Sequence, residues 1–174
     1  MNETIRNLME RRSIRTYKAE QIKPSELSAI LEAGKYAATA GGKQSPVLVV
    51  AQNPETVKRL SKLNAAFTGN PDGDPFYGAP TVVVVFADSR VKQYVEDGAL
   101  AIGNMMNAAH SLDVDSCWIH RAKEAFETDE GRALKREWGL SDDYVGVGNC
   151  VLGYRNCEYP QAQPRKDDYV IFAK

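Results

Sequence analysis

The chain has 174 residues, with 22 lysines and arginines against 23 aspartates and glutamates, so its formal charge is −1. This length and a hydrophobic content of 43% are typical of one globular domain, which we expect to span residues 1–174. The near-zero charge argues against a nucleic-acid-binding protein, because such proteins usually carry a large basic excess. Nucleic acid is therefore not expected among its partners.

Hydropathy and cysteine content exclude further classes of protein. The longest apolar run, Ala79 to Ala87, is far shorter than the about 20 residues that cross a bilayer, so no membrane segment is expected. Residues Met1 to Arg6 do not resemble a secretory signal, and we expect a cytoplasmic protein. Three cysteines and two histidines match neither a disulfide framework nor a metal-binding spacing, which predicts reduced thiols and no metal.

Capping residues and apolar periodicity predict four helices, of which the second and third are expected to lie at the surface with one buried face. The first covers about residues 3–10, with Asn2 as its N-cap. A second begins at Pro24 and a third at Asn53–Pro54, because proline is favoured in the first helical turn. A later helix covers about residues 129–138.

Valine-rich runs predict the strands of the sheet. The runs 47–51 and 81–87 are continuously apolar and rich in β-branched residues, which is typical of strands covered on both faces, so both are expected to be central. Further strands are expected near residues 116–120 and 144–153. Strands and helices alternate without strict regularity, which predicts a mixed sheet flanked by helices.

Two segments indicate a second subunit. Residues 98–112 contain no Asp, Glu, Lys or Arg, which predicts a helix that is buried on all sides. In so small a chain, this burial is most easily explained by a homodimer. The tail, residues 161–174, ends in an apolar run at 169–172 that is typical of a strand, and the partner subunit would supply the sheet edge that it needs.

A dense group of cations lies near the amino terminus. Its members are Arg6, Arg11, Arg12, Arg15 and Lys18, opposed only by Glu10. The planar guanidinium group meets phosphate oxygens with two parallel hydrogen bonds, and Ser13 adds a hydroxyl donor in the same turn. The same cations would also neutralise the carboxyl end of the first helix. The spacing alone leaves both interpretations open, a site for one small phosphate or a helix terminus.

A loop of small residues, 37–46, leads into the first predicted strand. Without bulky side chains, the amides near Gly41 and Gly42 can donate to atoms at the rim of a flat ligand. Thr39 and Gln44 add polar side-chain contacts. The alternative interpretation is an ordinary turn between a helix and a strand.

Several common catalytic signatures are missing. The segment 146–148 lacks the third glycine of a dinucleotide-binding fingerprint, and the chain contains neither a phosphate-binding P-loop motif nor a G-x-S-x-G motif. His110 lies in the apolar helix and is expected to be a core residue. His120 follows a strand, where sites often form, but no orienting partner is evident in the sequence, so we expect a strand-end residue.

Several short motifs follow one another along nearly the whole chain. They are Arg11-Arg12-Ser13-Ile14-Arg15-Thr16-Tyr17, Ile30 to Gly34, Phe76 to Pro80 before the valine strand, Asp97 to Met106 leading to Ser116 to Ile119, Leu152-Gly153-Tyr154, and Pro164-Arg165. In this order and spacing they resemble the FMN-dependent nitroreductase family. The resemblance implies an α+β homodimer with an exchanged C-terminal strand and two FMN sites at the subunit interface.

The resemblance also implies cofactor contacts from several parts of the chain. The phosphate and ribityl chain would be held by Arg11, Arg12, Ser13, Arg15 and Arg165. The flavin of the other subunit would be reached by Ala38, Thr39, Ala40 and Gly42, with Gln44 in the same loop. The isoalloxazine ring would be lined by Asp97, Leu100, Trp118, Ile119, His120 and Arg121. A backbone N–H near His120 or Arg121 would face flavin N5, so the side chain of His120 need not act.

The function implied by this resemblance is an FMN-dependent oxidoreductase. Hydride would pass from NADH or NADPH to flavin N5 and then to a small electron acceptor such as a nitroaromatic compound or a quinone. The flavin would carry the chemistry, so no catalytic side chain is expected. One alternative is a flavin-binding storage or regulatory protein that NAD(P)H does not reduce. Another is a nucleic-acid module using residues 6–18, which the balanced charge disfavours.

Overall fold

The computed structural model describes residues 1–173, which form six α-helices and four strands. The helices are α1 (Glu3–Glu10), α2 (Pro24–Lys35), α3 (Pro54–Ala65), α4 (Tyr94–Ser111), α5 (Ala122–Phe126) and α6 (Asp129–Glu137). The strands are β1 (Pro46–Ala51), β2 (Thr81–Asp88), β3 (Asp115–Ile119) and β4 (Tyr144–Gly153), and the short 3-10 turns are η1 (Ala40–Gly42) and η2 (Asp167–Tyr169).

Local capping explains where several helices begin. The side chain of Asn2 accepts a hydrogen bond from the Ile5 N–H at 2.9 Å, and Asn53 and Thr128 accept from the first turns of α3 and α6. Each cap satisfies an N–H group that has no partner inside its helix. The predicted starts of these helices are confirmed. The five-residue helix α5 was not predicted, because it is too short to show an apolar period.

The four strands pair in the order β1-β2-β4-β3, and every pair is antiparallel. The expected mixed sheet is therefore antiparallel in all four strands, and its parallel element is the isolated bridge between Ser13 and Ser116. β2 is central and nearly completely buried, as predicted. β1 was also expected to be central, but it lies at the edge of the sheet and is only partly buried. An apolar run predicts that both faces of a strand are covered. It does not predict whether the strand has hydrogen-bonded neighbours on both sides.

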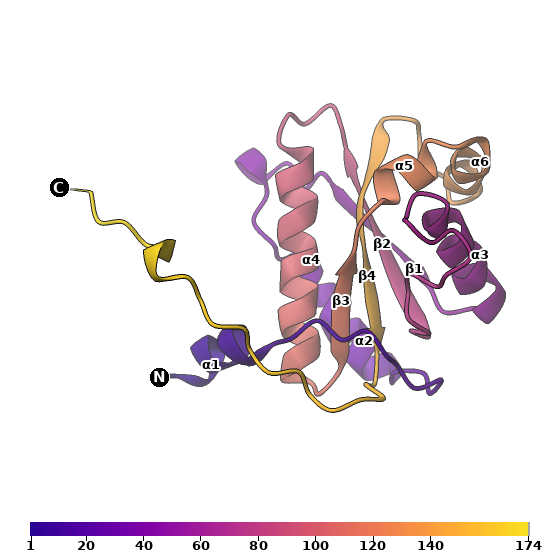
Figure 1. Cartoon of the computed structure of the whole chain (residues 1–174). Helices are drawn as coiled ribbons and strands as arrows, with labels where there is room; N and C mark the ends of the chain where they lie inside the picture. The colour runs from indigo at the N-terminus through magenta and orange to yellow at the C-terminus, as the bar shows by residue number, and fades with distance from the viewer. Residues whose placement is uncertain (174) are drawn as a thin grey trace.

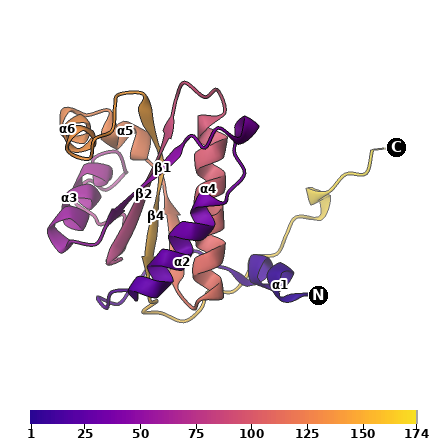
Figure 2. The same ribbon diagram turned by 180° about the vertical axis from the view of Figure 1, so that it is seen from behind.

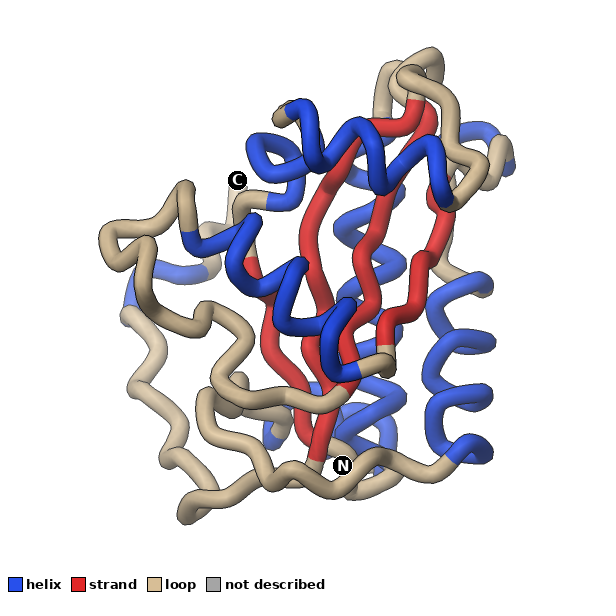
Figure 3. The backbone as a smooth tube through the Cα atoms, turned by 90° about the vertical axis from the view of Figure 1, so that its right-hand side faces the viewer, coloured by secondary structure: helices blue, strands red, loops and turns tan. Residues whose placement is uncertain are grey.

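Helices cover both faces of the sheet. Figure 1 and Figure 2 show α2 and α4 on one face, and Figure 3 shows the strands between these helices and the group formed by α3, α5 and α6. One core joins the sheet to α3, α5 and α6, with Phe86 and Phe126 packed edge to face at a centroid distance of 4.7 Å. The other core joins the sheet to α2 and α4 through Ile30, Ile102 and Met105. The α+β architecture is confirmed.

Helix α4 is less enclosed in one chain than its composition predicts. Met105 and Ala109 are fully buried against the sheet and α2, whereas Val95 and Leu100 are about half exposed on another face. The expectation of burial on all sides is therefore wrong for the single chain. Among residues 1–173, no helix combines the length and the apolar character needed to span a bilayer.

The C-terminal tail is anchored only at its beginning. The Lys18 N–H donates to the Tyr154 carbonyl at 2.8 Å, and the Asn156 N–H donates to the Thr16 carbonyl at 2.9 Å. Beyond Tyr159 the described residues are exposed, and Figure 1 shows the tail leaving the body of the protein. The strand expected at 169–172 does not form in the single chain, because its backbone lies against no sheet edge.

Candidate functional site

The arginine-rich segment after α1 runs along β3. Ser13 bridges Ser116, and the Ile14 N–H donates to the Ser116 carbonyl at 3.1 Å. Within residues 1–173, two buried guanidinium nitrogens lack a hydrogen-bond acceptor, Arg11 Nη1 and Arg12 Nε. Buried polar groups normally have partners, so such orphaned donors are typical of a place where an anion binds.

Arg12 also has a structural role. Its Nη1 donates to the carbonyl oxygens of Met9, Glu10 and Arg11 at 2.8 to 2.9 Å. These carbonyls lie at the carboxyl end of α1, where a cation is favourable. The helix-terminus interpretation therefore holds for Arg12 Nη1, while Arg12 Nε has no partner among the described residues and its role at a phosphate stays a prediction.

A cavity of about 320 Å³ brings Arg15 together with the residues that follow β3. The residues around it are Arg15, Asn64, Phe67, Thr68, Gly69, Pro75, Tyr77, Cys117, Trp118, Ile119, His120 and Arg121. Arg15 is exposed, and none of the described carboxylates lies within ion-pair distance of it. Five of the residues named from the sequence as cofactor contacts thus meet at one cavity.

The backbone after β3 is unusual. Arg121 has φ +78° and ψ 10°, a left-handed conformation that residues other than glycine rarely adopt. Among the described residues, neither the His120 N–H nor the Arg121 N–H has a hydrogen-bond acceptor. Strained backbone of this kind concentrates at binding sites, and two free donors at the wall of a cavity are suited to a polar ring edge.

Trp118 lines the cavity and also packs against the core that joins the sheet to α2 and α4. A Cβ added to Gly148 would lie 2.9 Å from the ring atoms Cε2 and Cζ2 of Trp118. The glycine therefore makes room for the indole. Cys117 lies at the cavity with its thiol buried, and burial raises its pKa above the ordinary value, so it is a neutral wall residue.

Asp97 forms hydrogen bonds with other residues of its own chain. It is buried, and its carboxylate accepts hydrogen bonds from the Ala40 N–H at 2.8 Å and the Ser45 hydroxyl at 2.6 Å. These bonds attach the small-residue loop to the first turn of α4. Gln44 within this loop has φ +51°, and its N–H donates to the Thr39 hydroxyl at 3.1 Å.

The small-residue loop lies at a different cavity of the same chain. Thr39, Gly42 and Gln44 line a space of about 600 Å³ next to the end of α2 and the start of β1. None of its lining residues lines the Arg15 cavity. The role of Ala38, Ala40 and their neighbours at the flavin of another subunit remains a prediction. So do the roles of the half-exposed Leu100 and of Arg165, which is exposed on the tail.

Sequence reasoning missed the wall formed by the end of α3 and the segment that follows it. Asn64, Phe67, Thr68 and Tyr77 line the Arg15 cavity, and none of them belongs to a charged or glycine-rich pattern. One signal was available, because an aromatic residue followed by glycine before the valine strand is a turn sequence. In the structure both Tyr77 and Gly78 have positive φ, at 58° and 76°.

Arg15 and the free backbone donors at this cavity suit a protein that binds a flat anionic ligand. The model of the nitroreductase family matches residues 8–74 and 68–154. This chain therefore belongs to the nitroreductase family.

Individual relatives agree with this assignment. A relative from Archaeoglobus fulgidus, named "Putative NADH dehydrogenase/NAD(P)H nitroreductase", is 30% identical over 161 residues, which cover 88% of this chain and 86% of the relative. A Bacillus subtilis relative named FMN reductase (NAD(P)H) is 34% identical over 98 residues, covering 56% of this chain and 37% of that protein. The crystal structure of a nitroreductase with bound FMN from Bacteroides fragilis is 27% identical, covers 100% of both chains and has a TM-score of 0.91.

Proposed function

We propose that this protein is an FMN-dependent oxidoreductase that uses NADH or NADPH. The observation that carries the proposal is the meeting of Arg15 with the His120–Arg121 turn at one cavity. Arg11 and Arg12, which precede Arg15 in the same segment, add buried guanidinium nitrogens that have no acceptor among the described residues. Cationic donors and neutral backbone donors are what a phosphate and a heteroaromatic ring need from one site. The fold shared with an FMN-bound nitroreductase supports the proposal.

Two sets of hydrogen-bond donors would bind different parts of the cofactor. Arg11, Arg12 and Arg15 would hold the phosphate, with each charge-assisted hydrogen bond contributing about 1.5–3 kcal/mol. The free N–H groups of His120 and Arg121 would hold the ring edge without titrating. When bound, FMN supplies a hydride carrier between NAD(P)H and an acceptor such as a nitroaromatic compound or a quinone. The protein contributes position and charge, so activity requires no acidic or basic side chain.

Anaerobic spectroscopy tests this function. The purified protein, reconstituted with FMN and freed of excess cofactor, should retain flavin absorbance, and NADH or NADPH should bleach it. Adding a quinone or a nitroaromatic compound should restore the absorbance. Retained flavin that neither nicotinamide reduces would favour a storage protein, and a protein that retains no flavin would contradict the proposal.

We also propose that the working form is a homodimer. Val95 and Leu100 on α4 and the apolar residues Ile5 and Leu8 on α1 are about half exposed in the single chain. α4 and α1 contact one another, so these residues belong to adjoining elements. Exposed apolar side chains gathered on adjoining helices support an interface with a second copy of the chain.

The tail would complete the dimer by strand exchange. Among the described strands, β1 pairs on one side only, with β2, so its other edge can accept a strand. The apolar tail residues 169–172 are strongly exposed in the single chain and would pair there with the partner's β1. Light scattering of the full chain should give twice the monomer mass of 19.2 kDa. Leu100→Glu should yield monomers, whereas Glu96→Gln at an exposed position of the same helix should not.

The free thiols favour a reducing compartment. Cys157 is exposed and forms no disulfide, and Cys117 and Cys150 are buried as free cysteines. Exposed unpaired cysteines are uncommon in oxidising surroundings, so we place the protein in the cytoplasm. Fractionation of the native cells with an antibody would locate it.

A further inference from the structure

Two asparagine side chains form a buried amide pair beneath the Arg15 cavity. Asn64 on α3 and Asn149 on β4 are both 2% exposed. Asn149 Nδ2 donates to Asn64 Oδ1 at 3.2 Å and to the Ile119 carbonyl oxygen at 3.3 Å. The pair therefore connects α3, β4 and the last residue of β3.

Stability alone does not account for this pair. Asn64 Nδ2 is buried and has no acceptor among the described residues, and leaving such a donor unpaired costs about 1–3 kcal/mol. Two apolar side chains of similar size would avoid that cost. The amide groups are therefore better explained by the geometry that they impose on Ile119.

That geometry determines the direction of one backbone donor. The Ile119 carbonyl and the His120 N–H belong to the same planar trans peptide, so they point in opposite directions. Because the carbonyl faces the side-chain amide of Asn149, the His120 N–H points away from that amide. His120 lines the Arg15 cavity, and its N–H has no acceptor among the described residues, so the donor is left free for a ligand.

The next residues of the turn are also fixed from β4. A Cβ added to Gly146 would lie 2.6 Å from the Ala122 carbonyl oxygen, so the glycine allows the start of α5 to pack directly on the strand. Between the two contacts on β4, Arg121 adopts its left-handed conformation. The turn from Ile119 to Ala122 thus has support at both ends.

We propose that Asn149, held by Asn64, is a positioning residue that directs the His120 N–H toward the ring of the bound flavin. This inference rests on the proposed function and adds the side chains that set the donor in place. It assigns the donor to the backbone of His120, with no contribution from the imidazole.

Selective labelling makes the test direct. The chain contains two histidines, so protein labelled with 15N-histidine gives two backbone amide signals, and His110, which lies in the last turn of α4 and does not line the Arg15 cavity, serves as the internal reference. FMN should move the His120 amide signal strongly and the His110 signal little. In Asn149→Ala the FMN-induced shift of His120 should disappear, and FMN affinity should fall by about tenfold, the equivalent of one hydrogen bond.

Two further variants keep the result interpretable. Val84→Ala is the matched control. Val84 is buried and pairs with Asn149 across the β2–β4 ladder, and this pairing does not involve the turn from Ile119 to Ala122. It should lose stability and keep the full His120 shift. If Asn149→Ala does not fold, Asn64→Leu removes the acceptor of the Asn149 amide and should reduce the shift.

The outcomes separate the inference from the proposed function. Flavin fluorescence quenched by the wild-type protein with an unmoved His120 signal would overturn the inference and leave the function standing. A full shift in folded Asn149→Ala or Asn64→Leu would overturn the positioning role. Wild-type protein that binds no FMN would overturn the proposed function, and the inference with it.

Discussion

The carboxylate of Asp97 accepts a hydrogen bond from the Ser45 hydroxyl at 2.6 Å, and both residues are buried although 52 positions separate them in the chain. A second bond, from the Ala40 N–H at 2.8 Å, attaches the same carboxylate to the turn η1. One acid at the start of α4 therefore holds the small-residue loop in place.

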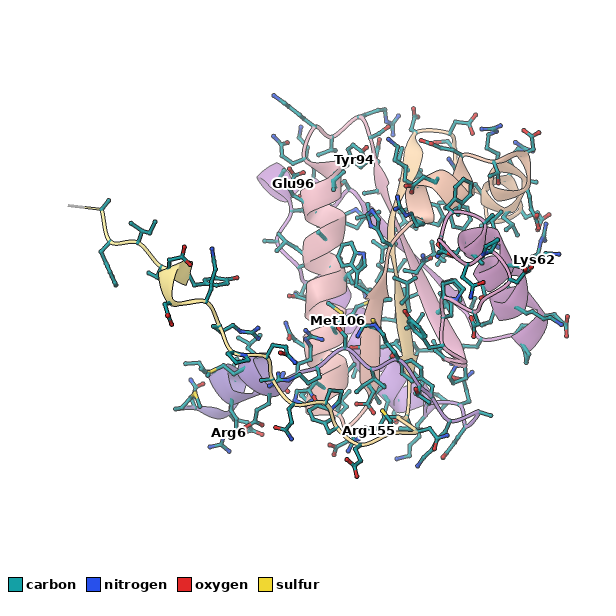
Figure 4. All side chains as sticks on the ribbon, in the orientation of Figure 1. Arg6, Lys62, Tyr94, Glu96, Met106 and Arg155 are labelled. Atoms are coloured by element: carbon teal, nitrogen blue, oxygen red, sulfur yellow. The ribbon has the colours of Figure 1, made fainter. Side chains whose placement is uncertain are left out.

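Replacing Asp97 should loosen this loop. Asp97→Ala leaves the Ser45 hydroxyl and the Ala40 N–H without an acceptor, so the free energy of unfolding should fall by about 2–3 kcal/mol. Urea denaturation measures the loss. Glu96→Ala is the control, because Glu96 lies in the same first turn of α4 but is exposed (Figure 4). Equal losses in the two variants would show that the charge at the helix end matters and the two bonds do not.

Removing Arg15 should weaken cofactor binding and leave stability unchanged. Arg15 lines the candidate cavity and is exposed, so Arg15→Ala should lower FMN affinity by about 10- to 100-fold, the equivalent of one charge-assisted hydrogen bond. Quenching of FMN fluorescence gives the affinity. Arg6→Ala removes the same charge from the exposed surface of α1 (Figure 4) and should have little effect. A similar loss in both would point to general electrostatic attraction.

A methyl group at position 148 should disturb the packing under the cavity. In Gly148→Ala the new Cβ would lie 2.9 Å from the Trp118 ring and 3.0 Å from Ile102 Cδ1, so the unfolding free energy should fall by about 1–3 kcal/mol. Near-ultraviolet circular dichroism should report the displaced indole. Gly69→Ala is the control, since nothing lies within 4 Å of its added Cβ. An unchanged tryptophan signal in Gly148→Ala would contradict this packing.

His110 should make the protein less stable in mild acid. Burial lowers its pKa below the ordinary value near 6.5, the carboxylate of Asp115 opposes this effect, and the Arg11 guanidinium adds to it. As the pH falls through about 6.5, the unfolded chain therefore binds a proton that the folded protein does not, and the unfolding free energy decreases. The loss levels off below the lowered pKa of the folded state.

Substitution isolates this contribution. His110→Phe preserves an aromatic ring stacked on Tyr159, whose centroid lies 5.9 Å from that of His110. It should flatten the dependence of unfolding free energy on pH between pH 7 and pH 5, measured by urea denaturation. A slope that survives in His110→Phe would assign the effect to other groups.

Local signals in the sequence determined much of the architecture. Asn2, Asn53 and Thr128 are N-caps whose side chains accept hydrogen bonds from N–H groups in the first helical turn. The starts of these helices therefore follow from residues that are neighbours in the chain. The apolar run of β2 also predicted its complete burial, because a strand covered on both faces needs no polar alternation. The motif order along the chain was enough to indicate the family to which it belongs.

Other features required the packed chain. β1 and β2 have similar composition, yet one is an edge strand and the other is central, because strand order depends on contacts between distant residues. Asn64 carries no sequence signal, and it gains its importance only where α3 packs against β4. For Asp97, the motifs predicted a contact with the flavin ring, and the structure adds its hydrogen bonds to Ser45 and Ala40, which no local pattern specified.

The sequence by itself thus determined the elements, the cationic segment and the family, since these depend on residue type and spacing along a few turns of chain. The tertiary structure decided which of the candidate residues share a cavity, how the peptide after Ile119 is oriented, and which edge of the sheet is open. These properties arise from hydrogen bonds and packing between segments far apart in the chain, whose partners no local pattern specifies.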